Sequence, residues 1–254
     1  MHVLPLAFRP CRSGLRSRWM RSSRSRPEPL ALPPAGFAHR GLHGAAVPEN
    51  SMTAFRAAIE AGAGIECDVR LSADDVPMIF HDADLTRLCG EGGSIERMNA
   101  ATLAGKRLGG TTDTIPRLAE LLMLARGRVP LLVECKTRGN AARLAEAVCR
   151  TLGARPGPVG VMSFDPCIGR WLGRTRPDVR RGLVLDGNDG ALVRWAKMAR
   201  ARPDFLAINV DRLGRPWVAR ARRTIPVYSW TIRTAGQRQI ATADALIWEA
   251  DGRP

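Results

Sequence analysis

A regular alternation of strand-sized and helix-sized segments from residue 117 to residue 249 limits the folds open to this chain. Short apolar runs typical of buried strands lie at 129–136, 158–164, 181–186, 205–210, 225–232 and 245–249. Segments with helical periodicity separate or precede them, at 117–126, 140–153, 166–174, 189–201, 215–223 and 234–242. Strands that alternate with helices build parallel sheets, so an α/β fold is predicted.

Two further strands are predicted before this region. Residues 36–41 favour a short strand, and a helix capped by Asn50 or Ser51 and ended by Gly62 follows. Residues 64–72 then alternate strictly between apolar and polar side chains, which indicates a strand. Eight strands in 254 residues predict a closed (β/α)8 barrel, a fold of about 250 residues. A doubly wound open sheet is the alternative, but a glycine-rich dinucleotide loop is missing after the first strand.

A hairpin is predicted directly after the second barrel strand. Only four residues separate strand 64–72 from a strand at 77–82, too few for a parallel crossover. In a symmetric hairpin the paired residue numbers sum to 149, which places His81 opposite Asp68. Residues 83–116 contain much Gly and Thr and are expected to form an insertion over the active-site end.

The N-terminal 35 residues differ in composition from the rest. They contain seven arginines and one acid and show no periodicity, so a basic, disordered arm is predicted at 1–35 before a single domain at 36–254. A transit peptide and a true start at Met20 are alternatives. The net charge of +15 is compatible with nucleic acid, an anionic membrane or a phosphate-handling surface.

Composition also bears on location and on metals. No apolar stretch approaches the roughly 18–20 residues of a membrane span, so a transmembrane segment is not expected. The six cysteines form no C-x-x-C pair, which argues against a zinc site. With no disulfides expected and no signal-peptide pattern at the N-terminus, a reducing, cytoplasmic setting is predicted.

Chemically useful side chains gather at the carboxyl ends of the first strands, where barrels of this kind hold their active sites. The acids of this group are Glu66, Asp68 and Glu134. Three carboxylates favour a hard cation with oxygen ligands, Mg²⁺ or Ca²⁺.

Basic side chains accompany these acids. Arg40 and Lys136 suit a phosphate group, and His39 and His81 are candidates for a general acid and a general base. Glu49 has three possible roles: metal ligand, support for Arg40, or helix start.

These residues occur in ordered motifs that resemble the glycerophosphodiester phosphodiesterase family over residues 36–250. The motifs are His39-Arg40-Gly41, Pro48-Glu49-Asn50-Ser51, Ile65-Glu66-Cys67-Asp68-Val69, Phe80-His81-Asp82, Glu134-Cys135-Lys136 and Ser229-Trp230-Thr231. The resemblance implies a (β/α)8 enzyme with one divalent cation that hydrolyses glycerophosphodiesters to sn-glycerol 3-phosphate and an alcohol.

The resemblance also implies a role for each matching residue. By this resemblance, the metal ligands would be Glu66, Asp68 and Glu134, and the acid and base would be His39 and His81. Arg40 and Lys136 would contact the phosphate, and Trp230 would form a wall of the pocket. Glu49 and Asn50 would be supporting residues. The expected partner is a small glycerophosphodiester, and not nucleic acid. Two alternatives stay open: a phosphodiester lyase of the sphingomyelinase D type, which leaves a cyclic phosphate, and a basic nucleic-acid-binding module.

Overall fold

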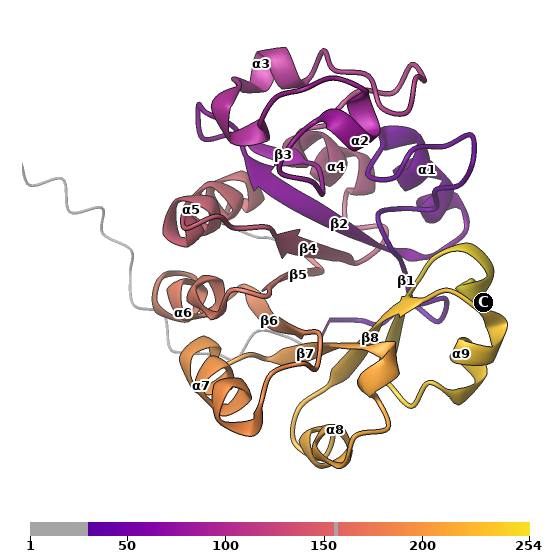
Figure 1. Ribbon diagram of the computed structural model, residues 1–254, viewed down its shortest axis with the longest axis vertical. Helices are drawn as coiled ribbons and strands as arrows, with labels where there is room; N and C mark the ends of the chain where they lie inside the picture. The colour runs from indigo at the N-terminus through magenta and orange to yellow at the C-terminus, as the bar shows by residue number, and fades with distance from the viewer. Residues whose placement is uncertain (1–29, 155–156) are drawn as a thin grey trace, which may run out of the picture.

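The computed structural model describes residues 30–154 and 157–254 and shows a closed barrel (Figure 1). Among these residues eight parallel strands form the barrel: β1 (Phe37–Ala38), β2 (Gly64–Leu71), β4 (Leu131–Cys135), β5 (Val159–Ser163), β6 (Arg180–Leu185), β7 (Phe205–Asn209), β8 (Val227–Ile232) and β9 (Ala245–Trp248). Strand β1 pairs with both β2 and β9 and closes the barrel. The predicted (β/α)8 fold is confirmed.

Helices cover the outside of the barrel between successive strands (Figure 1). They are α1 (Met52–Glu60), α4 (Leu118–Ala125), α5 (Ala141–Leu152), α6 (Pro166–Thr175), α7 (Ala191–Ala201), α8 (Pro216–Ala221) and α9 (Ala235–Ile240). The apolar face of β2, with Ile65, Cys67, Val69 and Leu71, lies in a core shared with α1, α4 and α5. The polar face of β2 therefore points into the barrel, as its alternation predicts.

The lower interior of the barrel is apolar. Phe37, Leu132, Phe205 and Tyr228 fill it, and the rings of Phe205 and Tyr228 stack with centroids 4.7 Å apart. Gly182 makes room for Phe205, because a Cβ atom on this glycine would lie 2.4 Å from the Phe205 ring. This packed floor confines polar side chains to the carboxyl ends of the strands.

The hairpin exists, but its predicted register is wrong by one residue. Strand β3 (Pro77–Ile79) pairs with β2 so that Val69 is opposite Ile79, and paired numbers sum to 148. The loop has three residues rather than four, because Ser72 and Val76 also bond across it, and Asp75 adopts a left-handed conformation with φ 60°. Asp68 therefore bonds to Phe80 through the backbone, and His81 lies beyond the ladder.

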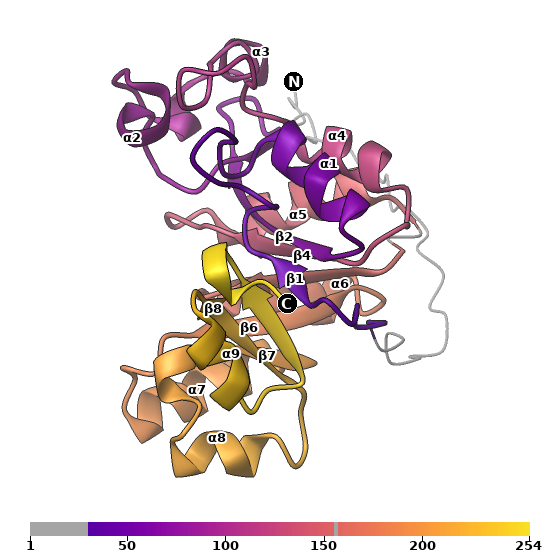
Figure 2. The same cartoon turned by 90° about the vertical axis from the view of Figure 1, so that its right-hand side faces the viewer.

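The segment after the hairpin forms a small subdomain with its own apolar core (Figure 2). It contains α2 (Thr86–Cys89), a 3₁₀ turn at Ile95–Arg97 and α3 (Ala100–Leu103). Buried Leu85, Ile95 and Leu103 pack against Met78 and Phe80. The subdomain is thereby attached to the hairpin that carries His81.

Residues 1–29, most of the predicted arm, lie outside the described residues, and the proposed division at residue 35 stays a prediction. Leu30 is buried against the apolar barrel floor. None of the helices in the described part of the chain is long and apolar enough to span a membrane.

Candidate functional site: a buried carboxylate cluster between two histidines

Three carboxylates meet inside the upper barrel. Glu66 and Asp68 lie on β2, and Glu134 lies on the neighbouring β4 in register with Asp68. One oxygen from each carboxylate lies within 4.8 Å of those from the other two. Glu66, Asp68 and Glu134 are only 1%, 1% and 7% exposed. The three acids predicted as metal ligands are thus brought together.

The chemistry of this cluster fits a divalent cation. Burial, reinforced by the charges of Asp68 and Glu134, raises the pKa of Glu66 well above its usual value, and burial raises that of Glu134. Glu66 Oε1 is buried without a hydrogen-bond partner. Buried carboxylates at such spacing need a compensating positive charge, and oxygen ligands of this kind suit Mg²⁺ or Ca²⁺.

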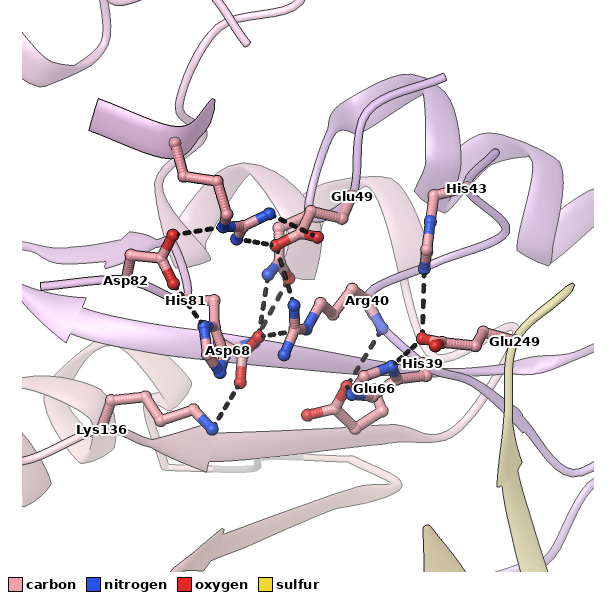
Figure 3. Close-up of polar contacts among 12 residues, drawn as sticks. His39, Arg40, His43, Glu49, Glu66, Asp68, His81, Asp82, Lys136 and Glu249 are labelled. Atoms are coloured by element: carbon pink, nitrogen blue, oxygen red, sulfur yellow. Dashed lines mark hydrogen bonds and ion pairs between the residues drawn. The ribbon is translucent and has the colours of Figure 1, made fainter. Parts of the chain in front are cut away.

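Two basic side chains already contact Asp68. Lys136 Nζ lies 3.1 Å from Asp68 Oδ1, and Arg40 Nε lies 3.1 Å from Asp68 Oδ2 (Figure 3). Lys136 Nζ also lies 2.5 Å from Glu134 Oε1. Although burial acts to raise it, Lys136 and Arg40 hold the pKa of Asp68 below its usual value. The predicted phosphate contacts therefore lie directly beside the predicted metal ligands.

Asn50 supports this arrangement from the loop after β1. Its amide group donates to Asp68 Oδ2 at 2.9 Å, and its backbone N–H donates to the Arg40 carbonyl at 2.8 Å. Arg40 and Asn50 both adopt left-handed conformations, with φ of 55° and 56°. Non-glycine residues in this region are often associated with functional sites. Between them, Gly41 is required, since a Cβ atom there would lie 2.8 Å from Ala54 Cβ.

His39 lies beside the cluster and is held by a residue that the sequence analysis did not identify. Its Nδ1 lies 2.5 Å from Glu249 Oε2, and its Nε2 lies 4.0 Å from Glu66 Oε2. Burial lowers the pKa of His39, although the hydrogen bond to Glu249 acts to raise it. Arg233 Nε donates to the other oxygen of Glu249 at 2.7 Å. Glu249 follows the last strand, so the rule that placed the other residues at strand ends could also have found it.

His81 is held in a similar way on the opposite side of Asp68 (Figure 3). Its Nδ1 lies 2.7 Å from Asp82 Oδ1, and Arg87 Nε from α2 donates to the second oxygen of Asp82 at 2.6 Å. Burial also lowers the pKa of His81. Arg87 was not predicted, because a lone arginine in the insertion carries no sequence signal.

Glu49 belongs to the basic side of the site and not to the carboxylate cluster. It accepts hydrogen bonds from Arg40 Nη1 at 2.9 Å and from Arg87 Nη2 at 2.6 Å. Of the three roles considered for Glu49, support for Arg40 agrees with these contacts. Glu49 also links Arg40 to the insertion through Arg87.

A cavity of about 350 Å³ opens beside the cluster and is lined in part by Glu134, Lys136, Ser163 and Phe164. Trp230 contacts the Phe164 ring edge-on, with centroids 5.5 Å apart, and Lys136 Nζ lies 5.7 Å from the centre of that ring. Trp230, the predicted wall residue, contacts Phe164 but does not itself line this cavity. The cavity volume falls in the range of small-molecule sites.

Glu66→Gln is expected to stabilise the protein when metal is removed. Above the usual glutamate pKa of 4.5, the unfolded wild-type chain releases a proton that folded Glu66 retains, so wild-type stability falls with rising pH relative to the variant. The difference in the free energy of unfolding between the variant and the wild type should grow by up to about 1.4 kcal/mol per pH unit. Thermal unfolding in chelator between about pH 5 and pH 8 measures it. A constant difference across this range would contradict the assignment of Glu66.

Comparison with known proteins identifies the family of this chain. The model of the glycerophosphoryl diester phosphodiesterase family matches residues 39–250. YhdW of Bacillus subtilis strain 168, which carries a provisional name as a glycerophosphodiester phosphodiesterase, is 26% identical over 227 residues, covering 83% of this chain and 92% of YhdW. A glycerophosphodiester phosphodiesterase of Bacillus altitudinis is 34% identical over 116 residues, 42% of this chain and 46% of that protein.

Solved structures show the same architecture. A phosphodiesterase of Oleispira antarctica, in complex with the product sn-glycerol-3-phosphate, has a TM-score of 0.77 at 23% identity and covers 87% of this chain and 94% of its own. The glycerophosphodiester phosphodiesterase of Agrobacterium tumefaciens has a TM-score of 0.66 at 26% identity, with coverages of 85% and 95%. With the family match spanning the barrel from His39 to Ala250, this chain belongs to the glycerophosphodiester phosphodiesterase family of enzymes.

Proposed function

We propose that the enzyme hydrolyses glycerophosphodiesters to sn-glycerol 3-phosphate and an alcohol, with a divalent cation held by Glu66, Asp68 and Glu134. The observation that supports this most strongly is the buried cluster of these carboxylates, with His39 and His81 on its two sides. When bound, Mg²⁺ or Ca²⁺ would supply Lewis-acid polarisation of the phosphoryl oxygens.

Arg40 and Lys136 bind and orient the phosphodiester in this proposal. Both lie beside Asp68 at the mouth of the cluster, and both remain positively charged at neutral pH. The guanidinium of Arg40 offers two parallel donors to the non-bridging oxygens, whereas Lys136 acts as a point charge. Trp230 and Phe164 form an aromatic wall next to the phosphate.

The two histidines move the protons. Each has Nδ1 held by a carboxylate, Glu249 or Asp82, which favours the tautomer with Nε2 free to accept a proton. One histidine takes the proton of the attacking hydroxyl, either of water or of the glycerol 2-OH, as the new P–O bond forms. The other, which must enter the reaction protonated at Nε2 as well as Nδ1, gives its Nε2 proton to the departing alcohol oxygen as its P–O bond breaks. Attack by the 2-OH leaves a cyclic phosphate that water then opens.

Turnover of a small panel of glycerophosphodiesters tests this proposal. The panel varies the alcohol, and each substrate is assayed with Mg²⁺, with Ca²⁺ and with chelator, with the phosphorus product identified. Cation-dependent release of sn-glycerol 3-phosphate is expected. A stable cyclic phosphate would instead identify a lyase, and equal turnover in chelator would exclude a role for the cation.

A cytoplasmic location and a role in lipid and glycerol metabolism are part of the same proposal. Cys67, Cys135 and Cys149 are free thiols in apolar surroundings, as expected of a reducing compartment. Cell fractionation with an antibody against the full chain tests the location, and a protein recovered from an oxidising compartment would contradict it.

A further inference from the structure

His43 joins His39 and Glu249 in a second group of potential metal ligands, separate from the three carboxylates. One ligand atom from each residue lies within 4.8 Å of those from the other two. We propose that His39, His43 and Glu249 bind Zn²⁺, and that zinc at this position inhibits the enzyme. The site itself is independent of the proposed function, whereas the inhibition rests on the proposed role of His39.

The donor set and its spacing suit zinc. Two imidazoles and one carboxylate are an established set of zinc ligands, with metal–ligand distances of about 2.0–2.2 Å. Tetrahedral ligands at this distance lie roughly 3.3 Å from one another. His43 Nε2 is 3.6 Å from Glu249 Oε2 and already fits, and the 2.5 Å contact of His39 Nδ1 with the same oxygen must lengthen by roughly 0.8 Å.

The Nε2 atom of His43 points into this group. It is buried and makes no hydrogen bond of normal length, and its carboxylate neighbour Glu249 Oε2 lies 3.6 Å away. Arg233 holds the other oxygen of Glu249 and fixes the direction of Oε2 (Figure 3 shows His43 and His39 on either side of Glu249). Buried nitrogen atoms without partners are uncommon and often mark a missing ligand.

The two sites differ in the ions that they favour and in access. The carboxylate cluster offers only oxygen, which suits Mg²⁺ or Ca²⁺, whereas imidazole nitrogen favours zinc. His43 also lines a cavity of about 230 Å³ together with Pro48, Glu49 and Leu88, so an ion and its remaining water ligands can enter beside it. Zinc can therefore bind the histidine site while Mg²⁺ saturates the carboxylates.

Zinc at this site would change which nitrogen of His39 carries the proton. Zinc binds a neutral imidazole through a nitrogen without a proton, so coordination by Nδ1 requires the other tautomer of His39. The single proton that Nδ1 shares with Glu249 moves by exchange with solvent to Nε2, the atom that faces Glu66, and no net proton is released. With Nε2 protonated and Nδ1 bound to zinc, His39 can no longer accept a proton. This site could not be predicted from the sequence, because a His-x-x-x-His spacing in a loop lacks the fixed face of a helix.

Zinc binding to the full-length protein tests the site directly. Calorimetric titration with Zn²⁺, and visible absorption with Co²⁺ as a spectroscopic substitute, are performed with saturating Mg²⁺. One tight equivalent is expected for the wild type, and His43→Gln should weaken it by at least roughly tenfold, the loss seen even for outer-shell partners. His2→Gln is the control: it removes a histidine that is not part of the proposed site and should bind Zn²⁺ as tightly as the wild type does.

The activity assay tests the inhibition. His43→Gln should turn over substrate at the wild-type rate without zinc and need at least roughly tenfold more Zn²⁺ for half inhibition. Equal zinc affinity in His43→Gln and the wild type would overturn the site. If Zn²⁺ binding depends on His43 but bound zinc leaves turnover unchanged, the proposed site stands and only the proposed inhibition is overturned. If no glycerophosphodiester is turned over at all, the titration still decides the site, so failure of the proposed function is recognised separately.

Discussion

Asp68→Asn is expected to reduce kcat/KM by on the order of 10²–10³-fold, the scale at which loss of one preorganised electrostatic group slows an enzyme. Asp68 is the residue on which the site converges, because Lys136, Arg40 and Asn50 all contact it. The amide keeps the shape of the side chain but cannot offer an anionic oxygen to a cation. Steady-state kinetics over a range of Mg²⁺ concentrations measure the loss, and excess cation should restore only part of the rate.

The variant should still fold. Lys136 retains its contact with Glu134, and Arg40 retains its contact with Glu49, so neither basic side chain is left without a carboxylate. Asp75→Asn is the matched control: Asp75 lies in the hairpin loop after the same strand, in an exposed ion pair with Arg143, and should keep the wild-type rate. A near-normal rate for Asp68→Asn, with the control also normal, would refute the central role of Asp68.

His39→Gln and His81→Gln are each expected to lower kcat by about 10²–10⁴-fold, the usual contribution of a positioned acid or base. The contacts of the two residues are too similar to show which is the acid, since each ring is held by one carboxylate at Nδ1. The leaving group can separate them. A glycerophosphodiester with a p-nitrophenol leaving group needs little protonation, so the variant that lacks the acid should recover most of its rate.

The variant that lacks the base should stay slow with either leaving group, because the attacking hydroxyl still has to lose its proton. His43→Gln, in the same loop as His39, is the control and should behave as the wild type in zinc-free buffer. If both variants recover with p-nitrophenol, or neither does, the division of roles between His39 and His81 is wrong. The comparison is made on kcat, so weaker binding cannot imitate it.

The barrel and the face of β2 could be predicted from the sequence because each rests on a local pattern. Alternation at Ile65, Cys67, Val69 and Leu71 fixed which side of the strand would be buried against helices, and the structure agrees. The position of the active site then followed from the fold, since every parallel strand of a barrel presents its carboxyl end at the same rim.

What the sequence did not predict depends on geometry beyond a single strand. The hairpin register was wrong because Ser72 pairs with Val76, a choice set by the turn conformation of Asp75 and not by the apolar pattern. The strand-end rule could have drawn attention to Glu249, but not to its contact with His39, because the two are 210 residues apart and no local pattern connects them. Arg87 reaches Glu49 and Asp82 only through the folded insertion.

Closure of the barrel by the two-residue strand β1 has a consequence for the order in which the site can form. Phe37 pairs with Ile247, and His39 contacts Glu249, so the earliest and latest parts of the barrel must meet before the first histidine is held. The carboxylates of β2 and β4 need only the chain up to Cys135, the last residue of β4. Such distant contacts form late in folding, because the entropy of closing a long loop must be overcome first. During synthesis the acidic cluster can therefore assemble well before the protein acquires its complete proton-transfer machinery.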